Sequence, residues 1–217
     1  MKQHDLKVVV LDFDGTLVES NKIKDQVFET IFSEWPEHKW EMMRWHLQRN
    51  AMDRREKFSY FVEEKLRQRG NIKLINQLTD KFSEMTHQAI VDCPMVQGAQ
   101  TFLDEYVAQL PLFLASATPQ KNLDEILKER GLEKYFKETY GAPINKVEVL
   151  KKIMSDEKVL PEEILYIGDS LEDHQAAELL GISFIGKQSD RLLNGKTNNV
   201  FTEFVQIRKY FKKKYNI

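Results

Sequence analysis

The segment Val8-Val9-Val10-Leu11, followed directly by Asp12-Phe13-Asp14-Gly15-Thr16, is the most informative part of this sequence. A continuous apolar run rich in valine is typical of a strand buried on both faces of a parallel sheet. Two carboxylates at the end of such a strand lie where open parallel sheets bind their ligands. The segment therefore predicts an α/β protein with a polar site after its first strand.

Two later apolar runs have the same character, and helical patterns separate the runs. The expected strands are Lys7 to Phe13, Leu112 to Ala115 and Ile164 to Ile167, with shorter ones near Thr139-Tyr140 and Ser183 to Ile185. The expected helices after the second strand are Asn122 to Arg130, Leu171 to Leu180 and Thr202 to Lys214. Alternation of strands with helices predicts a doubly wound, Rossmann-like parallel sheet.

The segment from residue 18 to residue 92 differs from the rest because it contains helical patterns and no convincing buried strand. Its apolar residues recur at helical spacing, as in Ile23, Val27 and Ile31. We therefore expect an all-helical cap domain at residues 18–92, inserted into an α/β core domain formed by residues 1–17 and 93–217.

The composition is that of an ordinary globular protein, with 41% apolar and 30% charged residues. A formal net charge of -2 gives no strong field that would attract nucleic acid or an anionic membrane. Cys93 is the single cysteine, so no disulfide can form within the chain. There is also no apolar run long enough for a membrane helix and no signal-peptide pattern, which favours a cytoplasmic protein.

The first motif offers two carboxylates that can divide the work of phosphate ester hydrolysis. Asp12 can attack phosphorus as a nucleophile. Asp14 can protonate the leaving oxygen and later deprotonate water. The alternative interpretation is a loop of helix-capping aspartates without chemistry.

Three later positions strengthen the catalytic interpretation. Ser116 ends the second strand and can donate to a phosphoryl oxygen, although a helix N-cap is an alternative. Lys146 can neutralise an anionic nucleophile, although a solvated lysine is an alternative. Asp169 and Asp173, four residues apart after the third strand, can share one helix face with their oxygens available to Mg²⁺.

Taken in this order, the four motifs resemble those of the haloacid dehalogenase superfamily, and the helical insert resembles the C1-type cap of its phosphoglycolate phosphatase and β-phosphoglucomutase relatives. The resemblance implies that Asp12 is the nucleophile and Asp14 the general acid/base. It implies a Mg²⁺ held by the Asp12 carboxylate, the Asp14 backbone carbonyl and an acid of the fourth motif, Asp169 or Asp173. It also implies a phosphate site at Gly15, Thr16, Ala117 and Thr118. The third motif departs from the frequent Gly-Lys-Pro pattern because residue 142 is alanine, so its lysine is placed at Lys146.

The segment Arg49 to Arg55 lies between helical patterns and resembles the substrate-specificity loop of such caps. Asp53 is suited to cap the next helix, which places Arg54 on its first turn. Arg54 and Arg49 are therefore candidate substrate-binding residues, since an arginine fork suits a carboxylate or a phosphate. The alternative is that both are solvated charges at helix ends.

These features predict a Mg²⁺-dependent phosphatase that hydrolyses a small phosphorylated metabolite through an aspartyl-phosphate intermediate. A sugar phosphomutase would share every core residue, and a non-catalytic module on the same fold is a further alternative. A haloacid dehalogenase is disfavoured by Asp14, since the family's dehalogenases lack the acid/base aspartate. Phosphoglycolate, sugar phosphates, nucleotides and pyrophosphate remain open as substrates, as does the oligomeric state.

Overall fold

The protein is described from a computed structural model, which covers residues 5–49, 52–189 and 199–215. Within these residues one parallel sheet has the strand order β3-β2-β1-β4-β5-β6. The strands are β1 Val8–Leu11, β2 Leu112–Pro119, β3 Glu138–Ala142, β4 Ile164–Gly168, β5 Ser183–Lys187 and β6 Val200–Phe201. The central position of β1, with later strands added on both sides, confirms the prediction of a doubly wound sheet. The short edge strand β6 was not predicted.

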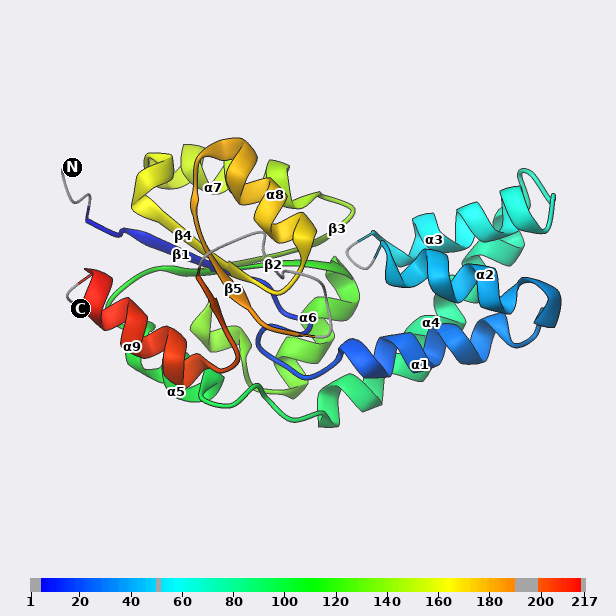
Figure 1. Cartoon of the computed structure of the whole chain (residues 1–217), viewed down its shortest axis with the longest axis horizontal. Coiled ribbons are helices and arrows are strands. Elements are labelled where there is room, and N and C mark those ends of the chain that lie inside the picture. The colour runs from blue at the N-terminus through cyan, green and yellow to red at the C-terminus, as the bar shows by residue number, and fades with distance from the viewer. Residues whose placement is uncertain (1–4, 50–51, 190–198, 216–217) are drawn as a thin grey trace.

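Helices cover both faces of the sheet (Figure 1). One face carries α5 Ala99–Tyr106, α6 Gln120–Glu129 and α9 Phe204–Tyr215, and the other carries α7 Lys146–Glu157 and α8 Leu171–Leu180. Short 3-10 turns at Glu133–Tyr135 and Pro161–Glu163 precede β3 and β4. In β1, Val9 and Leu11 pack on the first face, while Val8 and Val10 pack on the second. Burial on both faces is the reason that this strand is a run of apolar residues.

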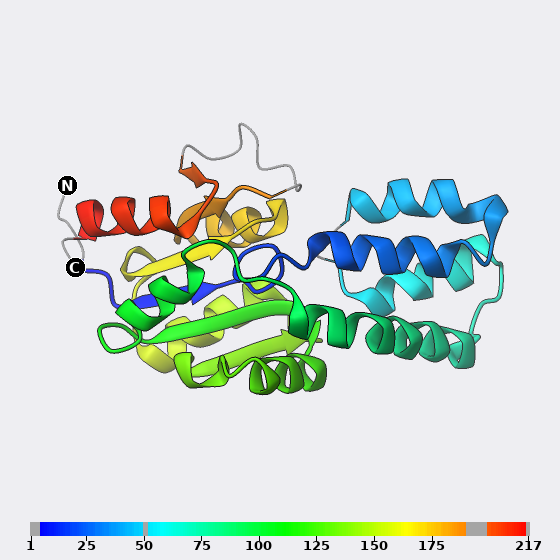
Figure 2. The same ribbon diagram turned by 90° about the horizontal axis from the view of Figure 1, so that it is seen from below.

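The remaining helices form a separate group beyond the end of the sheet at which β1 finishes (Figure 1, Figure 2). They are α1 Asn21–Phe32, α2 Pro36–Leu47, α3 Arg54–Tyr60, which continues into a π-helical turn at Phe61–Lys65, and α4 Ile72–Asp92. Their own apolar core includes Phe28, Ile31, Phe58 and Phe82. We call α1 to α4 the helical group.

Two chain segments connect the helical group with the sheet, and they lie side by side. Val18 forms an antiparallel bridge with Met95, and the backbone amide of Glu19 donates to the carbonyl of Pro94 at 3.0 Å. The domain boundaries at residues 17/18 and 92/93 remain a prediction. Among the described residues, no helix is long and apolar enough to cross a membrane.

Candidate active site

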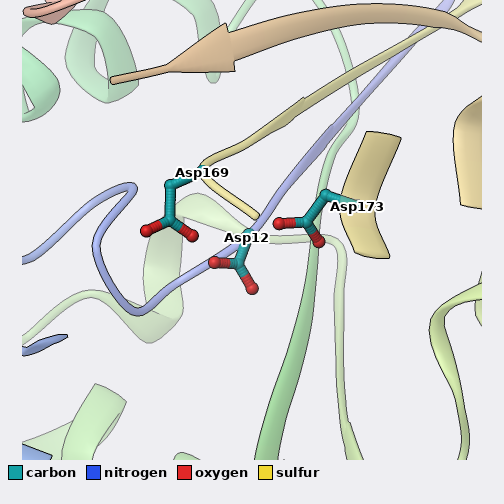
Figure 3. A group of neighbouring side chains, drawn as sticks. All are labelled: Asp12, Asp169 and Asp173. Atoms are coloured by element: carbon teal, nitrogen blue, oxygen red, sulfur yellow. The ribbon is translucent and has the colours of Figure 1, made fainter. Parts of the chain in front are cut away.

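Three buried aspartates meet where β1 and β4 end. Asp12 follows β1, Asp169 follows β4, and Asp173 lies in the first turn of α8. Figure 3 shows their carboxylates gathered around one point, and one oxygen of each lies within 4.8 Å of the others. The parallel pairing of β1 with β4 explains the meeting, because it brings the carboxyl ends of both strands to the same edge.

Gly15 lets the loop after β1 approach Asp169 closely. Its φ is +75°, and a Cβ at this position would lie 2.2 Å from Oδ2 of Asp169 and 2.1 Å from Nδ2 of Asn21. Any other residue would therefore be strained and would clash with the site. The Asn21 amide donates to Asp169 Oδ2 at 2.7 Å, so this residue, which sequence reasoning missed, holds that carboxylate in place.

Lys146 joins the site from the start of α7, where Asn145 and Glu148 form a capping box. Its ammonium donates to Asp12 Oδ1 at 2.8 Å and also bonds Asp173. Burial alone would lower the pKa of Lys146, but the charges of Asp12 and Asp173 outweigh burial and raise the pKa well above its usual value. The lysine is thus a fixed positive charge beside Asp12, and the alternative of a solvated surface lysine is wrong.

The Asp173 carboxylate accepts hydrogen bonds from several neighbours at once. Its donors include the Tyr166 hydroxyl at 2.5 Å and the Ser170 hydroxyl at 2.6 Å, as well as Lys146. Burial alone would raise the pKa of Asp173, but Lys146 and these hydrogen bonds lower it. Asp173 therefore orients Lys146 and, through Ser170, helps to cap α8.

The carboxylates of Asp12, Asp169 and Asp173 are suitable ligands for a divalent cation. Burial raises the pKa of Asp12 well above its usual value, although Lys146 opposes the rise. Burial, reinforced by the charge of Asp173, raises the pKa of Asp169 to about 6. A group of carboxylates that repel one another in a buried site would be stabilised by a cation, and Mg²⁺ prefers oxygen ligands of this kind.

The Asp14 side chain is not part of this acidic group. Its carboxylate accepts from the Ser20 hydroxyl at 2.6 Å, the Thr118 hydroxyl at 3.0 Å and the Ser116 hydroxyl at 3.4 Å, and it forms an ion pair with Lys24. Burial alone would raise the pKa of Asp14, but Lys24 and the hydroxyl donors outweigh burial and lower it. A capping role would not account for this set of partners.

The end of β2 supplies the hydroxyl groups of Ser116 and Thr118, which both donate to Asp14. Ser116 accepts from the backbone amide of Thr118 at 3.0 Å, and the residue that precedes the first turn of α6 is Pro119. Ser116 is thus not the N-cap of that helix, which removes its alternative interpretation. Thr16 donates to Asp12 Oδ2 at 3.3 Å. Ala117 and Thr118 line the cleft next to Asp12, and Ser116 lines a neighbouring cavity that also reaches Lys146.

A small cleft separates these core residues from the helical group, with a cavity volume of about 70 Å³. The helical group contributes Phe28, His46, Arg54, Lys57 and Phe82 to its wall. Sequence reasoning found Arg54 but missed His46 and Lys57, because a polar residue at a helical spacing gives no sign of burial.

The two candidate arginines differ in position. Arg54 is only 8% exposed, and its guanidinium donates to Ser83 Oγ at 2.9 Å and to Asn122 Oδ1 at 3.3 Å, so it bridges α4 and α6. The alternative of a solvated charge is therefore wrong for Arg54. Arg49 borders a neighbouring cavity of about 720 Å³, and its guanidinium lies 4.8 Å from the centre of the Trp45 ring.

Comparisons with known proteins agree with this geometry. The family model described as haloacid dehalogenase-like hydrolase matches residues 9–187. The chain belongs to the haloacid dehalogenase-like hydrolase family.

Relatives of this hydrolase match it over most of their length. It is 27% identical over 202 residues to a phosphoglycolate phosphatase of Vibrio parahaemolyticus serotype O3:K6, covering 86% of this chain and 85% of that one. A predicted phosphoglycolate phosphatase from Haemophilus somnus has a similar structure, with a TM-score of 0.72, 17% identity and coverage of 95% of this chain and 98% of that one. YfnB from Bacillus subtilis, a magnesium-bound HAD-hydrolase, has a TM-score of 0.71 at 16% identity, covering 99% and 100% of the two chains.

The family and fold expected from the four motifs are thereby confirmed, and so is the expectation of an enzyme. The hydrolase brings Asp12, Asp14, Lys146, Asp169 and Asp173 to one end of its sheet. The roles of these side chains, and of the phosphate-site and cap residues, remain predictions.

Proposed function

We propose that this hydrolase is a Mg²⁺-dependent phosphatase that cleaves a small phosphomonoester through an aspartyl-phosphate on Asp12. The observation that carries the proposal is the partly buried contact between Lys146 Nζ and Asp12 Oδ1 at 2.8 Å, with Asp169 beside it. This arrangement pairs a carboxylate nucleophile with a fixed cation and a place for a metal ion. The phosphatase relative in Vibrio supports the choice of a phosphate ester.

In the first half of the reaction, a carboxylate oxygen of Asp12 attacks phosphorus and the bond to the leaving alkoxide breaks. Asp14 gives its proton to the leaving oxygen. Lys146 and the Ser116 hydroxyl stabilise the charge on the phosphoryl oxygens. Mg²⁺, held by Asp12 and Asp169 with the Asp14 backbone carbonyl, would supply further positive charge at those oxygens.

In the second half, Asp14 takes a proton from a water molecule that attacks the phosphorus of the aspartyl-phosphate. The bond between Asp12 and phosphorus breaks, which releases inorganic phosphate and restores the carboxylate. In this half Asp14 must be ionised to act as a base, and its lowered pKa favours that form. In the first half it must carry a proton, which a phosphate ester that binds as its monoanion can supply.

The other functions differ from this one in the fate of the phosphoryl group. A sugar phosphomutase would pass it to a second hydroxyl instead of water, and a non-catalytic module would not accept it at all. We propose water as the acceptor, a small phosphorylated metabolite as the partner rather than nucleic acid or membrane, a cytoplasmic setting, and a cap domain at residues 18–92.

The test is a phosphate-release screen of the purified protein against phosphorylated metabolites, with Mg²⁺ and with a chelator. We expect release that requires Mg²⁺ and falls by at least roughly 10³-fold in Asp12→Asn. Asp156→Asn, which alters an exposed carboxylate on α7, is the matched control. Rapid quenching followed by mass spectrometry should trap a phosphorylated peptide that contains Asp12. Near-native turnover by Asp12→Asn would refute the mechanism.

A further inference from the structure

The first turn of α1 places a side-chain amide against the buried aspartates of the core. Asn21 is the first residue of α1, and its Nδ2 donates to Asp169 Oδ2 at 2.7 Å. Both side chains line the cleft that contains Asp12. Asn21 belongs to the helical group, whereas Asp169 follows β4 of the sheet. The hydrogen bond therefore joins two parts of the protein that have separate apolar cores, and the mechanism above makes no use of it.

Burial makes the Asp169 carboxylate dependent on hydrogen-bond donors from the protein. The residue is only 3% exposed, so little water is available to replace a lost hydrogen bond. The side chain of Ser189, in the segment after β5, provides one hydrogen bond, and Asn21 provides another. The orientation of this carboxylate is thus set partly by the sheet and partly by α1.

An amide is a suitable partner for a carboxylate that must also bind a cation. It donates a hydrogen bond without carrying a charge, so it does not repel a metal ion as a lysine would. The Asp169 carboxylate can still accept elsewhere, since an ionised carboxyl group has about four lone-pair positions. Carboxylates that bind metals are commonly held by such hydrogen bonds, and loss of the partner weakens metal binding.

Close packing places the Asn21 amide against the loop after β1. A Cβ on Gly15 would lie 2.1 Å from Asn21 Nδ2 and 2.8 Å from Asn21 Cγ, so the amide lies directly against the loop. The preceding residue, Ser20, donates to Asp14 at 2.6 Å. Two successive residues at the start of α1 therefore hold Asp14 and Asp169, and a displacement of α1 away from the sheet would break both hydrogen bonds.

We propose that Asn21 is a positioning residue for the metal site, and that through it Mg²⁺ binding and the seating of α1 on the core stabilise each other. The inference rests on the proposed phosphatase function, because it concerns the metal that this function requires. The coupling is reciprocal: a hydrogen bond that favours the metal-binding orientation of Asp169 is itself favoured by the bound metal. Mg²⁺ should therefore tighten the attachment of the helical group to the sheet.

Metal binding in the absence of substrate tests the role of Asn21. Mn²⁺ serves as the probe, because it takes the same oxygen ligands as Mg²⁺ and the electron paramagnetic resonance signal of the free ion gives the bound fraction. We expect Asn21→Ala to raise the Kd for Mn²⁺ by about tenfold or more. The matched control is Gln26→Ala, which removes an exposed amide from the same helix and should leave the Kd unchanged. An unchanged Kd in Asn21→Ala would overturn the assignment.

Hydrogen exchange of the wild-type protein gives a second readout, which requires no variant. Backbone amides of residues 24–28 should exchange about fivefold more slowly with Mg²⁺ than with a chelator, because the bound ion stabilises the seating of α1. The first turns of α2, at the far end of the helical group (Figure 1), are the internal reference. In Asn21→Ala the effect of Mg²⁺ on α1 should be smaller. Exchange in α1 that is independent of Mg²⁺ in the wild type would overturn the coupling.

The outcomes separate this coupling from the proposed phosphatase function. If the wild type binds no Mn²⁺ that Mg²⁺ can displace, both the metal site and the role of Asn21 are refuted. If Mn²⁺ binds equally to the wild type and Asn21→Ala, only the role of Asn21 is refuted. If Asn21→Ala weakens metal binding but the wild type hydrolyses no phosphate ester, the phosphatase function fails and the role of Asn21 stands.

Discussion

Lys24, in the first turn of α1, forms an ion pair with Asp14 at the end of β1. The same ammonium donates to the Thr118 hydroxyl of β2 at 3.1 Å. The residue proposed as general acid and base is therefore held by a helix of the helical group as well as by the sheet. Any movement of α1 relative to the sheet must change the partners of Asp14, which couples the position of the helical group to the proton-transfer group.

Replacement of Lys24 by methionine should impair the protonation of the leaving group, because Asp14 loses a partner that holds it in place, although loss of this cation also raises the pKa of Asp14. We expect kcat to fall by about tenfold or more for an alkyl phosphate, which needs a well-placed acid. The loss should be smaller for p-nitrophenyl phosphate, whose leaving group needs little protonation. Lys121→Met, at an exposed lysine of α6, serves as the control. An equal loss on both esters would show that Lys24 does not act through Asp14.

Asp169 and Asp173 should respond differently to conversion into asparagine. Asp169→Asn removes a proposed metal ligand, so the Mg²⁺ concentration for half-maximal activity should rise by about tenfold or more. Asp173→Asn weakens the ion pair with Lys146 and the hydrogen bond from Ser170, so it should lower the free energy of unfolding by roughly 1–3 kcal/mol. Activity titrations with Mg²⁺ and urea unfolding of both variants separate the two effects. A larger change in the Mg²⁺ requirement for Asp173→Asn would reverse the assignment.

Arg130 joins α6 to the end of α4, where the chain returns to the sheet. Its Nη1 donates to the carbonyls of Ile90, Val91 and Cys93 at 2.7, 2.6 and 2.8 Å. Arg130→Met should leave these partly buried carbonyls short of donors and cost about 1–3 kcal/mol of stability. Hydrogen exchange should also become faster in the last turn of α4. Arg69→Met, at an exposed arginine, is the comparison, and equal unfolding midpoints for both variants would contradict the role of Arg130.

The sequence allowed the central strands to be predicted because β1, β2 and β4 are buried on both faces and therefore consist of continuous apolar runs. The two-residue strand β6 is half-buried and too short to show any period. The carboxylates and Lys146 were also predictable, since a parallel sheet brings the carboxyl ends of its strands to one edge whatever the loops do.

Apart from Arg54, the residues contributed by the helical group were not predictable in the same way. Helical spacing identifies an apolar face, but it does not say which part of the sheet that face will meet. Ser20, Asn21 and Lys24 gain their roles only when α1 lies over Asp14 and Asp169. His46 and Lys57 are buried and contact each other, and no local pattern distinguishes such a pair from solvated side chains.

The contact of α5 with α9 provides a test of stability against pH. Glu105 forms ion pairs with Lys212 at 2.6 Å and with Arg208, whose Nε lies at 2.7 Å. The hydrogen bond from Lys212, followed by those from Arg208, lowers the pKa of Glu105. A carboxyl whose pKa is lower in the folded state stabilises the protein fully above its unfolded value of about 4.3, and this contribution is lost as the pH falls through the folded pKa. Because these ion pairs of Glu105 are partly exposed and screened by solvent, Glu105→Gln should cost only ~0.2–1 kcal/mol at neutral pH.

Thermal unfolding at a series of pH values should show the melting temperatures of the wild type and Glu105→Gln converging below about pH 4. Glu125→Gln, at an exposed glutamate of α6, should show a smaller difference at neutral pH. A gap between wild type and Glu105→Gln that stays constant down to the lowest pH would mean that the ionised carboxylate is not what joins α5 to α9.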